Sequence, residues 1–142
     1  MKSVFKLTLL CILSFFLSSC HNKKTDVIEE VYDNKSPRVV RTYEEKDGKK
    51  ELVGEKSFYP DKKIQLEGDY KNEKRSGIWT FYYQNGNKWS EGEYKDGLNN
   101  GKSTTWFENG NKRYEGQYKD GKQTGKWKFW DEKGNFVKEV SY

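Results

Sequence analysis

The sequence of 142 residues is poor in the residues that usually build metal sites, disulfides and sharp chain breaks. It has one histidine, two cysteines, two prolines and one methionine. The histidine, His21, follows Cys20 directly, and no Cys/His spacing typical of a metal site occurs. These shortages exclude a disulfide framework and a Cys/His metal centre, and the sequence predicts no cofactor.

Aliphatic residues are scarce as well. Hydrophobic residues make up 32% of the chain and charged residues 35%, a balance that by itself favours disorder. Aromatic residues, at 16%, argue the other way, because Tyr, Trp and Phe each bury a large area and favour strands. Aromatic side chains are therefore expected to hold the fold.

The N-terminus has the pattern of an export signal. Lys2 and Lys6 precede an apolar run over residues 7–17, which is shorter than the roughly 20 residues needed to span a bilayer. Residues 17–20, Leu-Ser-Ser-Cys, then resemble the lipobox of bacterial lipoproteins. The resemblance predicts that residues 1–19 are a signal peptide and that Cys20 is lipidated and held at a membrane. An ordinary secretory signal with an incidental cysteine is the alternative.

Charge and export bear on partners and location. Removal of residues 1–19 would take Lys2 and Lys6 from 27 basic residues and leave a small positive excess over 22 acidic ones, with both signs interleaved. Nothing concentrates positive charge as nucleic-acid binding requires, so no nucleic-acid partner is predicted. His21 stands where aspartate would signal inner-membrane retention, which favours lipid anchoring in the cell envelope at the outer membrane.

A repeat of 24 residues organises the remainder. Five columns share this step: Gly68, Gly92 and Gly116; Gly77, Gly101 and Gly125; Gly86, Gly110 and Gly134; Tyr70, Tyr94, Tyr118 and Tyr142; and Glu67, Glu91, Glu115 and Glu139. A period of this length indicates an array of small supersecondary units. Aromatic and β-branched residues over 77–84 lead into Asn85-Gly86, which predicts a β-hairpin with a two-residue type I′ turn. Asp96-Gly97 is a second turn signal.

The predicted turn fixes the pairing, so Trp79 should face Gly92 and Phe81 should face Ser90. Large rings are expected to lie over bare glycine backbone on a packed face with Trp79, Phe81, Tyr83 and Tyr94. The other face should carry Tyr82, Trp89, Trp106, Arg113 and Trp130. The middle unit is weaker, because Ser103 and Thr105 replace the Trp and Phe of its neighbours.

Towards the N-terminus the pattern becomes irregular. Residues 58–70 predict a hairpin with a different turn, and residues 43–56 a short capping hairpin. Residues 20–38 show no period. They are predicted to be a flexible tether, with a brief helical stretch around residues 26–32, so the repeat domain is predicted over 39–142.

The columns resemble MORN-type repeats, and in particular the bacterial variant of YwqK-family antitoxins. The matching stretches are residues 91–97 and 115–127, and the likeness covers about residues 55–142 well and 39–54 loosely. It implies an all-β fold, an elongated single-layer antiparallel sheet of tandem hairpins curved like a gutter. It also implies protein or lipid contacts and, for the antitoxin variant, neutralisation of a partner. It carries no catalytic residues to transfer.

Function is expected to be binding without catalysis. His21 lies on the predicted tether, and the glutamate column recurs in every unit, which favours structural ion pairs over one catalytic pair. Candidate binding residues are Tyr82, Trp89, Trp106 and Trp130 with Arg113, since Trp, Tyr and Arg dominate binding hot spots. The leading hypothesis is a non-enzymatic envelope lipoprotein that binds another protein. The alternatives are an immunity or antitoxin role, and glycan or peptidoglycan binding.

Overall fold

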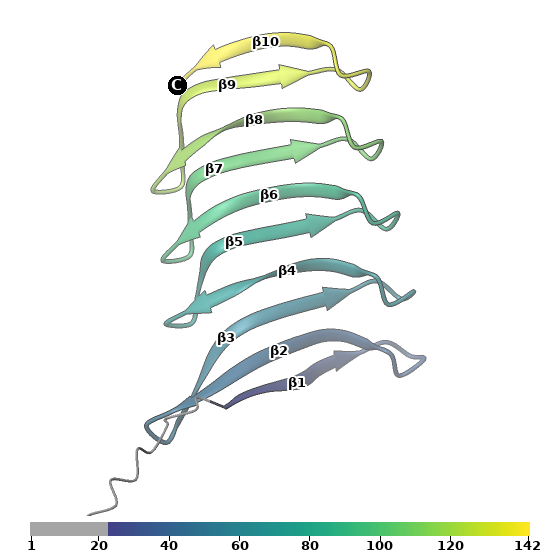
Figure 1. Ribbon diagram of the computed structural model, residues 1–142, viewed down its shortest axis with the longest axis vertical. Coiled ribbons are helices and arrows are strands. Elements are labelled where there is room, and N and C mark those ends of the chain that lie inside the picture. The colour runs from purple at the N-terminus through teal and green to yellow at the C-terminus, as the bar shows by residue number, and fades with distance from the viewer. Residues whose placement is uncertain (1–22) are drawn as a thin grey trace, which may run out of the picture.

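The computed structural model describes residues 23–142, so the predicted signal peptide and Cys20 lie outside the described residues. The strands are β1 (Lys24–Val31), β2 (Pro37–Lys46), β3 (Lys49–Phe58), β4 (Ile64–Lys71), β5 (Lys74–Tyr82), β6 (Lys88–Lys95), β7 (Leu98–Trp106), β8 (Lys112–Lys119), β9 (Lys122–Trp130) and β10 (Phe136–Ser141). Each strand pairs antiparallel with the next along the chain, in one open ten-stranded sheet (Figure 1). The predicted all-β array of hairpins is confirmed. Residues 23–142 contain no helix of membrane-spanning length and hydrophobicity.

The hairpins turn differently at the two edges of the sheet. At one edge, two-residue turns such as Asp96-Gly97 have positive φ at both residues, 51° and 87°, as a type I′ turn requires. At the other edge the loops have three residues. There the Tyr83 N–H donates to Asn87 O at 2.8 Å and the Gly86 N–H donates to Tyr83 O at 2.9 Å, with φ of 94° at Gly86.

The two-residue turn predicted at Asn85-Gly86 is therefore wrong. A type I′ turn needs positive φ at both central residues, and of these two only Gly86 has it. The predicted register holds from Gly77↔Tyr94 to Phe81↔Ser90 and then shifts, because Tyr82 pairs with Lys88. A β-bulge leaves Trp89 without a cross-strand partner, and such a bulge redirects side chains.

The predicted tether is wrong for residues 24–31, and no helix forms there. These residues form β1, which pairs with β2 and whose acidic side chains find partners: Thr42 Oγ1 donates to Asp26 at 2.7 Å and Tyr43 OH donates to Glu29 at 2.8 Å. Charged residues are common on an edge strand. The sheet therefore begins before residue 39.

The 24-residue pattern did not predict the β1–β2 and β3–β4 hairpins correctly, for two reasons. Equivalent loops start at Tyr32 and Tyr59, 27 residues apart, because β2 and β3 have ten residues each and break the 24-residue step. Lys35 and Lys62, at φ 63° and 68°, occupy the left-handed position that Gly86 holds later, so the glycine signal is missing. The turn of the 58–70 hairpin is thus the same loop, not a different one, and the hairpin expected over 43–56 is longer and is not the first.

The core lies on the face that carries Trp79 and Trp127, here called the core face. These are the two fully buried large side chains among the described residues, 0% and 1% exposed. Tyr70 and Tyr94 flank Trp79 with ring centroids at 5.2 and 6.3 Å. Tyr118 and Tyr142 flank Trp127 in the same way, at 5.0 and 6.2 Å. The predicted packed face is confirmed.

Each buried indole lies over a glycine, but over the glycine of the preceding strand. A Cβ added to Gly68 would stand 2.3 Å from the Trp79 ring, and one added to Gly116 would stand 2.2 Å from the Trp127 ring. The prediction that Trp79 lies over Gly92 is wrong, although the two residues do pair in register. The Trp79 Nε1–H donates to Asp69 O at 3.0 Å, which turns the ring towards β4. The two indoles thereby lock the β5–β6 and β9–β10 hairpins to the hairpins that precede them.

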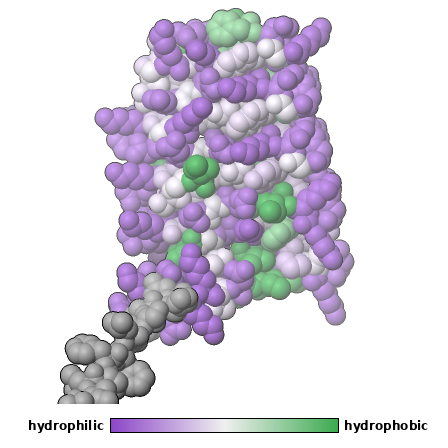
Figure 2. Space-filling view, viewed as in Figure 1, coloured by the Kyte–Doolittle hydropathy of each residue, from purple (hydrophilic) through white to green (hydrophobic). Residues whose placement is uncertain are grey.

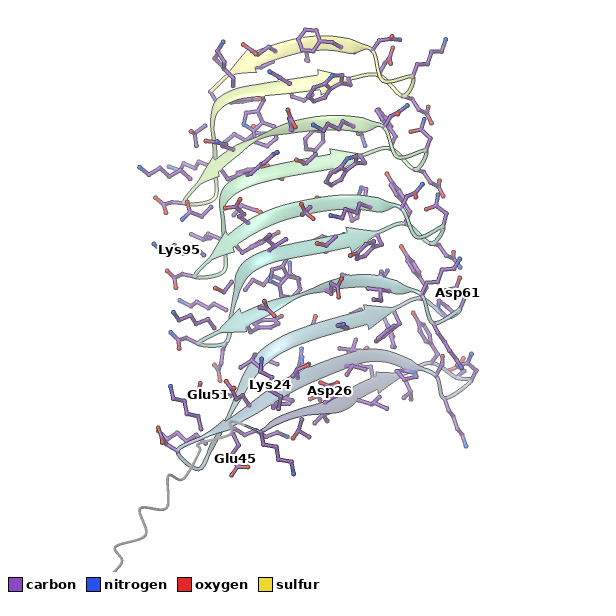
Figure 3. All side chains as sticks on the ribbon, viewed as in Figure 1. Lys24, Asp26, Glu45, Glu51, Asp61 and Lys95 are labelled. Atoms are coloured by element: carbon purple, nitrogen blue, oxygen red, sulfur yellow. The ribbon has the colours of Figure 1, made fainter. Side chains whose placement is uncertain are left out.

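Side chains project from a single layer of strands, so much of each face meets solvent. Figure 2 shows one face that is mainly hydrophilic, with a few separate hydrophobic patches. The two turn edges are marked in Figure 3 by Lys95, beside a two-residue turn, and by Asp61, in a three-residue loop. The face opposite the core face is here called the open face, and it carries Tyr82, Trp106 and Trp130.

Candidate binding face

The three open-face aromatics occupy one repeated position. Tyr82, Trp106 and Trp130 are 24 residues apart at the ends of β5, β7 and β9, and each is half-buried. Residues two apart on a strand share a face, so each aromatic stands on the same side as the Thr80, Thr104 or Lys128 before it. The structure places these three candidate residues together on the open face, as the sequence predicts.

Trp89 and Arg113 do not belong to this group, and their predicted placement is wrong. The Trp89 ring packs against Phe81 at 5.9 Å, and the Arg113 guanidinium lies 5.6 Å from the Phe107 ring centroid. Both residues sit at the unpaired position of a β-bulge, which turns their side chains to the core face. Trp89 remains 45% exposed there.

Each tryptophan of the open face has a lysine above it. The Lys112 ammonium lies 5.6 Å from the Trp130 ring centroid and 2.8 Å from Glu115 Oε2. Lys88 repeats this arrangement with Trp106, at 5.9 Å, and forms an ion pair with Glu91. Sequence reasoning did not place these lysines over the rings, although the same 24-residue step relates them. The result is a recurring group of glutamate, lysine and aromatic ring.

Tyr82 uses a related arrangement. Its hydroxyl donates to Glu67 Oε1 at 2.9 Å, and Glu67 also pairs with Lys56 at 3.4 Å. Burial, together with the hydrogen bond to Glu67, raises the pKa of the Tyr82 hydroxyl to about 12. The phenol is therefore neutral at physiological pH and acts as a hydrogen-bond donor.

The glutamate column forms the ion-pair ladder that the sequence predicts. The partners are Lys56, Lys88, Lys112 and, for Glu139, Lys126 at 2.8 Å. Hydrogen bonds from Lys112 and Lys126 hold the pKa of Glu115 and Glu139 below the usual range. A carboxylate kept ionised in this way is a poor proton donor at neutral pH and serves as the anionic partner of its lysine.

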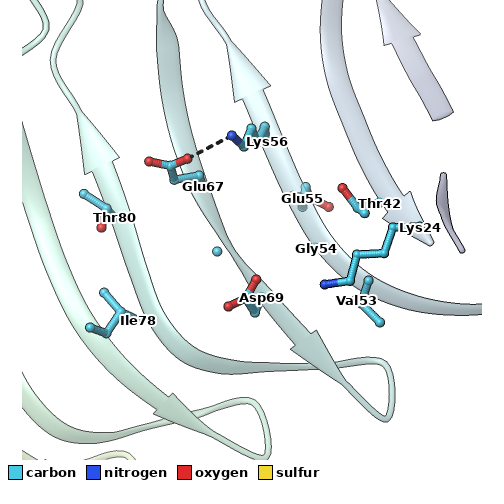
Figure 4. Close-up of a pocket in the computed structure, with 11 residues that line it drawn as sticks. Lys24, Thr42, Val53, Gly54, Glu55, Lys56, Glu67, Asp69, Ile78 and Thr80 are labelled. Carbon is cyan, nitrogen blue, oxygen red and sulfur yellow. Dashed lines mark ion pairs between the residues drawn. The ribbon is translucent and has the colours of Figure 1, made fainter. Parts of the chain in front are cut away.

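Open grooves follow the open face. One of about 400 Å³ lies between β1 and β5, where Lys24, Asp69 and Ile78 lie along it and Lys56 pairs with Glu67 (Figure 4). Another of about 480 Å³ is lined by Lys102, Glu115, Gly116, Gln117, Lys126 and Lys128. Residues 23–142 hold no group of three His, Cys, Asp or Glu side chains placed to bind a metal.

Comparison with known proteins agrees with this architecture. Three consecutive stretches, residues 55–72, 75–96 and 99–120, match the family described as MORN repeat variant. The second and third stretches coincide with the β5–β6 and β7–β8 hairpins. The predicted likeness to MORN repeats is confirmed for these units. No curated protein matches the chain.

Proposed function

We propose that this chain is a non-enzymatic binding module whose open face, at Tyr82, Trp106 and Trp130, binds another protein. The observation that carries the proposal is the repeated group of ring, lysine and glutamate in successive units. These side chains are not needed for the core, which lies on the opposite face. Similarity to MORN repeats supports the proposal, because such repeats are generally protein- or membrane-binding modules.

A protein fits this face better than a glycan. Sugars bind tryptophan by stacking on a free ring face, whereas Lys88 and Lys112 stand over the rings of Trp106 and Trp130. Aromatic side chains beside paired charges are typical of protein interfaces, where Trp and Tyr act as anchors. Neutralising a toxin would be one case of such binding, and the face itself does not favour it over other protein partners.

Capture with a matched control tests the proposal. The protein is used as bait on envelope extracts, and bound proteins are compared with those held by Tyr82→Ala/Trp106→Ala/Trp130→Ala. Trp89→Ala is the control, because it removes an exposed tryptophan from the core face. The expected result is a partner held by the wild-type protein and by the control but lost from the triple variant. A partner held equally by all three would contradict the assignment of the face.

The location is proposed on the N-terminal sequence alone. The lipobox-like residues 17–20 support lipidation at Cys20, which would anchor the sheet in the envelope, at the outer membrane in a cell with two membranes. Two or more acyl chains give stable anchoring where one does not. Labelling with a fatty-acid analogue should mark the wild-type protein and not Cys20→Ala, and the variant should leave the membrane fraction. Label retained in Cys20→Ala would refute this location.

A further inference from the structure

We infer that the C-terminal half of the open face receives an acidic peptide segment of the partner, an inference that rests on the proposed function. The observation is a charge gradient along equivalent positions of the repeat. Position 78 is Ile, and its equivalents 102 and 126 are Lys. A second column reads Lys56, Thr80, Thr104 and Lys128, so from β5 onward it also gains a lysine.

The acidic residues change in the opposite sense. Asp69 and Glu93 are followed in their column by Gln117 and then by Ser141. Glu67, Glu91 and Glu115 each form an ion pair with one lysine, so these three pairs are neutral and do not contribute to the gradient. The open face therefore goes from balanced charge near β4, where Lys24 and Lys56 stand beside Glu67 and Asp69, to a positive excess near β9, on a backbone that does not change. A gradient of this kind is not needed for folding and selects a partner by charge.

The basic end of the open face, near β9, contains a groove and lysines that form no ion pair within residues 23–142. Lys102, Lys126 and Lys128 line the groove of about 480 Å³. Within residues 23–142, neither Lys102 nor Lys128 forms an ion pair. Lys126 pairs only with Glu139, and the Lys126 side chain is 70% exposed. Carboxylates from outside can therefore reach all three ammonium groups.

The spacing of the lysines fits an extended peptide. Lys126 and Lys128 stand on one strand, two residues apart and on one face, so their Cα atoms are about 7 Å apart. An extended segment with acidic residues at alternate positions presents carboxylates at the same spacing. Trp106 lines a groove with Lys102, and Trp130 stands two residues beyond Lys128 on the same face of β9, so both rings offer apolar contact to the residues beside each acid.

Titration with designed peptides tests the inference. The probe is a ten-residue peptide of alternating Glu and Ser. Its binding is measured from the change in the tryptophan fluorescence of the protein. A peptide of the same composition with its acids in one block tests the spacing, and an alternating Lys and Ser peptide tests the sign of the charge. Tighter binding of the alternating Glu peptide than of the block peptide, with no binding of the Lys peptide, is expected.

The matched variants carry equal changes of charge. Lys126→Glu/Lys128→Glu should weaken the alternating Glu peptide about 10-fold or more, since four units of charge change at the contact. Lys119→Glu/Lys122→Glu, which flanks the Asp120-Gly121 turn, should change the affinity less than about twofold because those side chains lie outside the groove. Equal weakening by both variants would overturn the inference, because only the net charge would matter.

Two further measurements distinguish a peptide site from a general attraction for negative charge, and the inference from the proposed function. Equal affinity for an oligogalacturonate of matched charge would show that any polyanion binds, and would also overturn the inference. Loss of the captured partner from Tyr82→Ala/Trp106→Ala/Trp130→Ala, together with no binding of the acidic peptide, would leave the proposed function standing and refute the inference alone.

Discussion

The β5–β6 and β9–β10 hairpins, which carry Trp79 and Trp127, have the same backbone conformation as the β7–β8 hairpin between them, but their side chains pack differently. The β7–β8 hairpin is here called the middle unit, and the other two are called the outer units. In the outer two, an indole covers the glycine of the preceding strand, with ring atoms 2.2–2.3 Å from where a Cβ would stand. In the middle unit Ser103 replaces the indole. The space above Gly92 holds Asn99, Ser103 and the Tyr94 ring, at 3.4–3.7 Å from the same point.

The packing of an indole over the glycine of the preceding strand is here called the aromatic interlock. The difference between the units shows that strands can pair without it. The middle unit pairs as its neighbours do, Gly92↔Ser103 and Ser103↔Gly116, and buries Ser103, Thr104 and Thr105. Its backbone follows from the turns and the register, which the flanking hairpins impose on it. The interlock supplies stability, and the array tolerates one unit without it.

Removing an indole should have the largest effect. Trp127→Ala deletes a side chain that is 1% exposed, and should lower the free energy of unfolding by about 3–5 kcal/mol. Ser103→Ala, at the equivalent position, should cost less than about 1 kcal/mol, because few contacts are lost. Urea denaturation of both variants measures the difference. Equal losses would mean that the interlock is not what separates the units.

Installing the interlock in the middle unit should sharpen the comparison. Asn99→Gln/Ser103→Trp copies the Gln123 and Trp127 pair and places an indole over Gly92, between Tyr94 and Tyr118. A gain of about 1 kcal/mol is expected from the new aromatic contacts. Thermal unfolding measures it, with Asn99→Gln alone as the control. A lower Tm for the double variant would show that the middle unit cannot accept the indole.

A cation distinguishes the two outer units. The Arg75 guanidinium lies 4.1 Å from the Trp79 ring centroid, whereas the equivalent residue beside Trp127 is Gln123. Arg75→Ala should cost about 1 kcal/mol through the lost cation–π contact. Gln123→Ala should cost about half of that or less, since no charge is involved. Denaturation curves of the two variants measure both losses of stability. Equal losses would contradict a stabilising role for the Arg75 guanidinium.

The smallest expected effect is on pH dependence. The hydrogen bond from Lys112 lowers the pKa of Glu115 below its unfolded value of 4.5. The stabilisation is therefore present above pH 4.5 and is lost as pH falls through the lower folded pKa. Because the pair is partly exposed, it contributes under about 1 kcal/mol. Glu115→Gln should reduce the fall in stability between pH 5 and pH 3, and an unchanged slope would contradict the assignment.

Periodicity predicted the sheet, the core face and the register up to the β-bulge, because alternation and glycine columns report directly on strand pairing. It could not place Trp89 and Arg113, since a β-bulge moves side chains between faces without changing the spacing. It also missed β1. Lys35 and Lys62 adopt the left-handed backbone that glycine marks elsewhere, and hydrogen bonds donated by Thr42 and Tyr43 accommodate the acidic residues of that strand. Sequence pattern alone does not show such pairings.

The most direct test of the interlock is a comparison of the same substitution at two equivalent glycines. Gly116→Ala places a methyl group 2.2 Å from the Trp127 ring, and Gly92→Ala places one 3.4 Å from its nearest neighbour, the Asn99 side chain. Denaturation should show a loss of about 3 kcal/mol for Gly116→Ala and a change within about 1 kcal/mol for Gly92→Ala. Equal stability of the two variants would contradict the claim that indoles seated on bare backbone hold this sheet together.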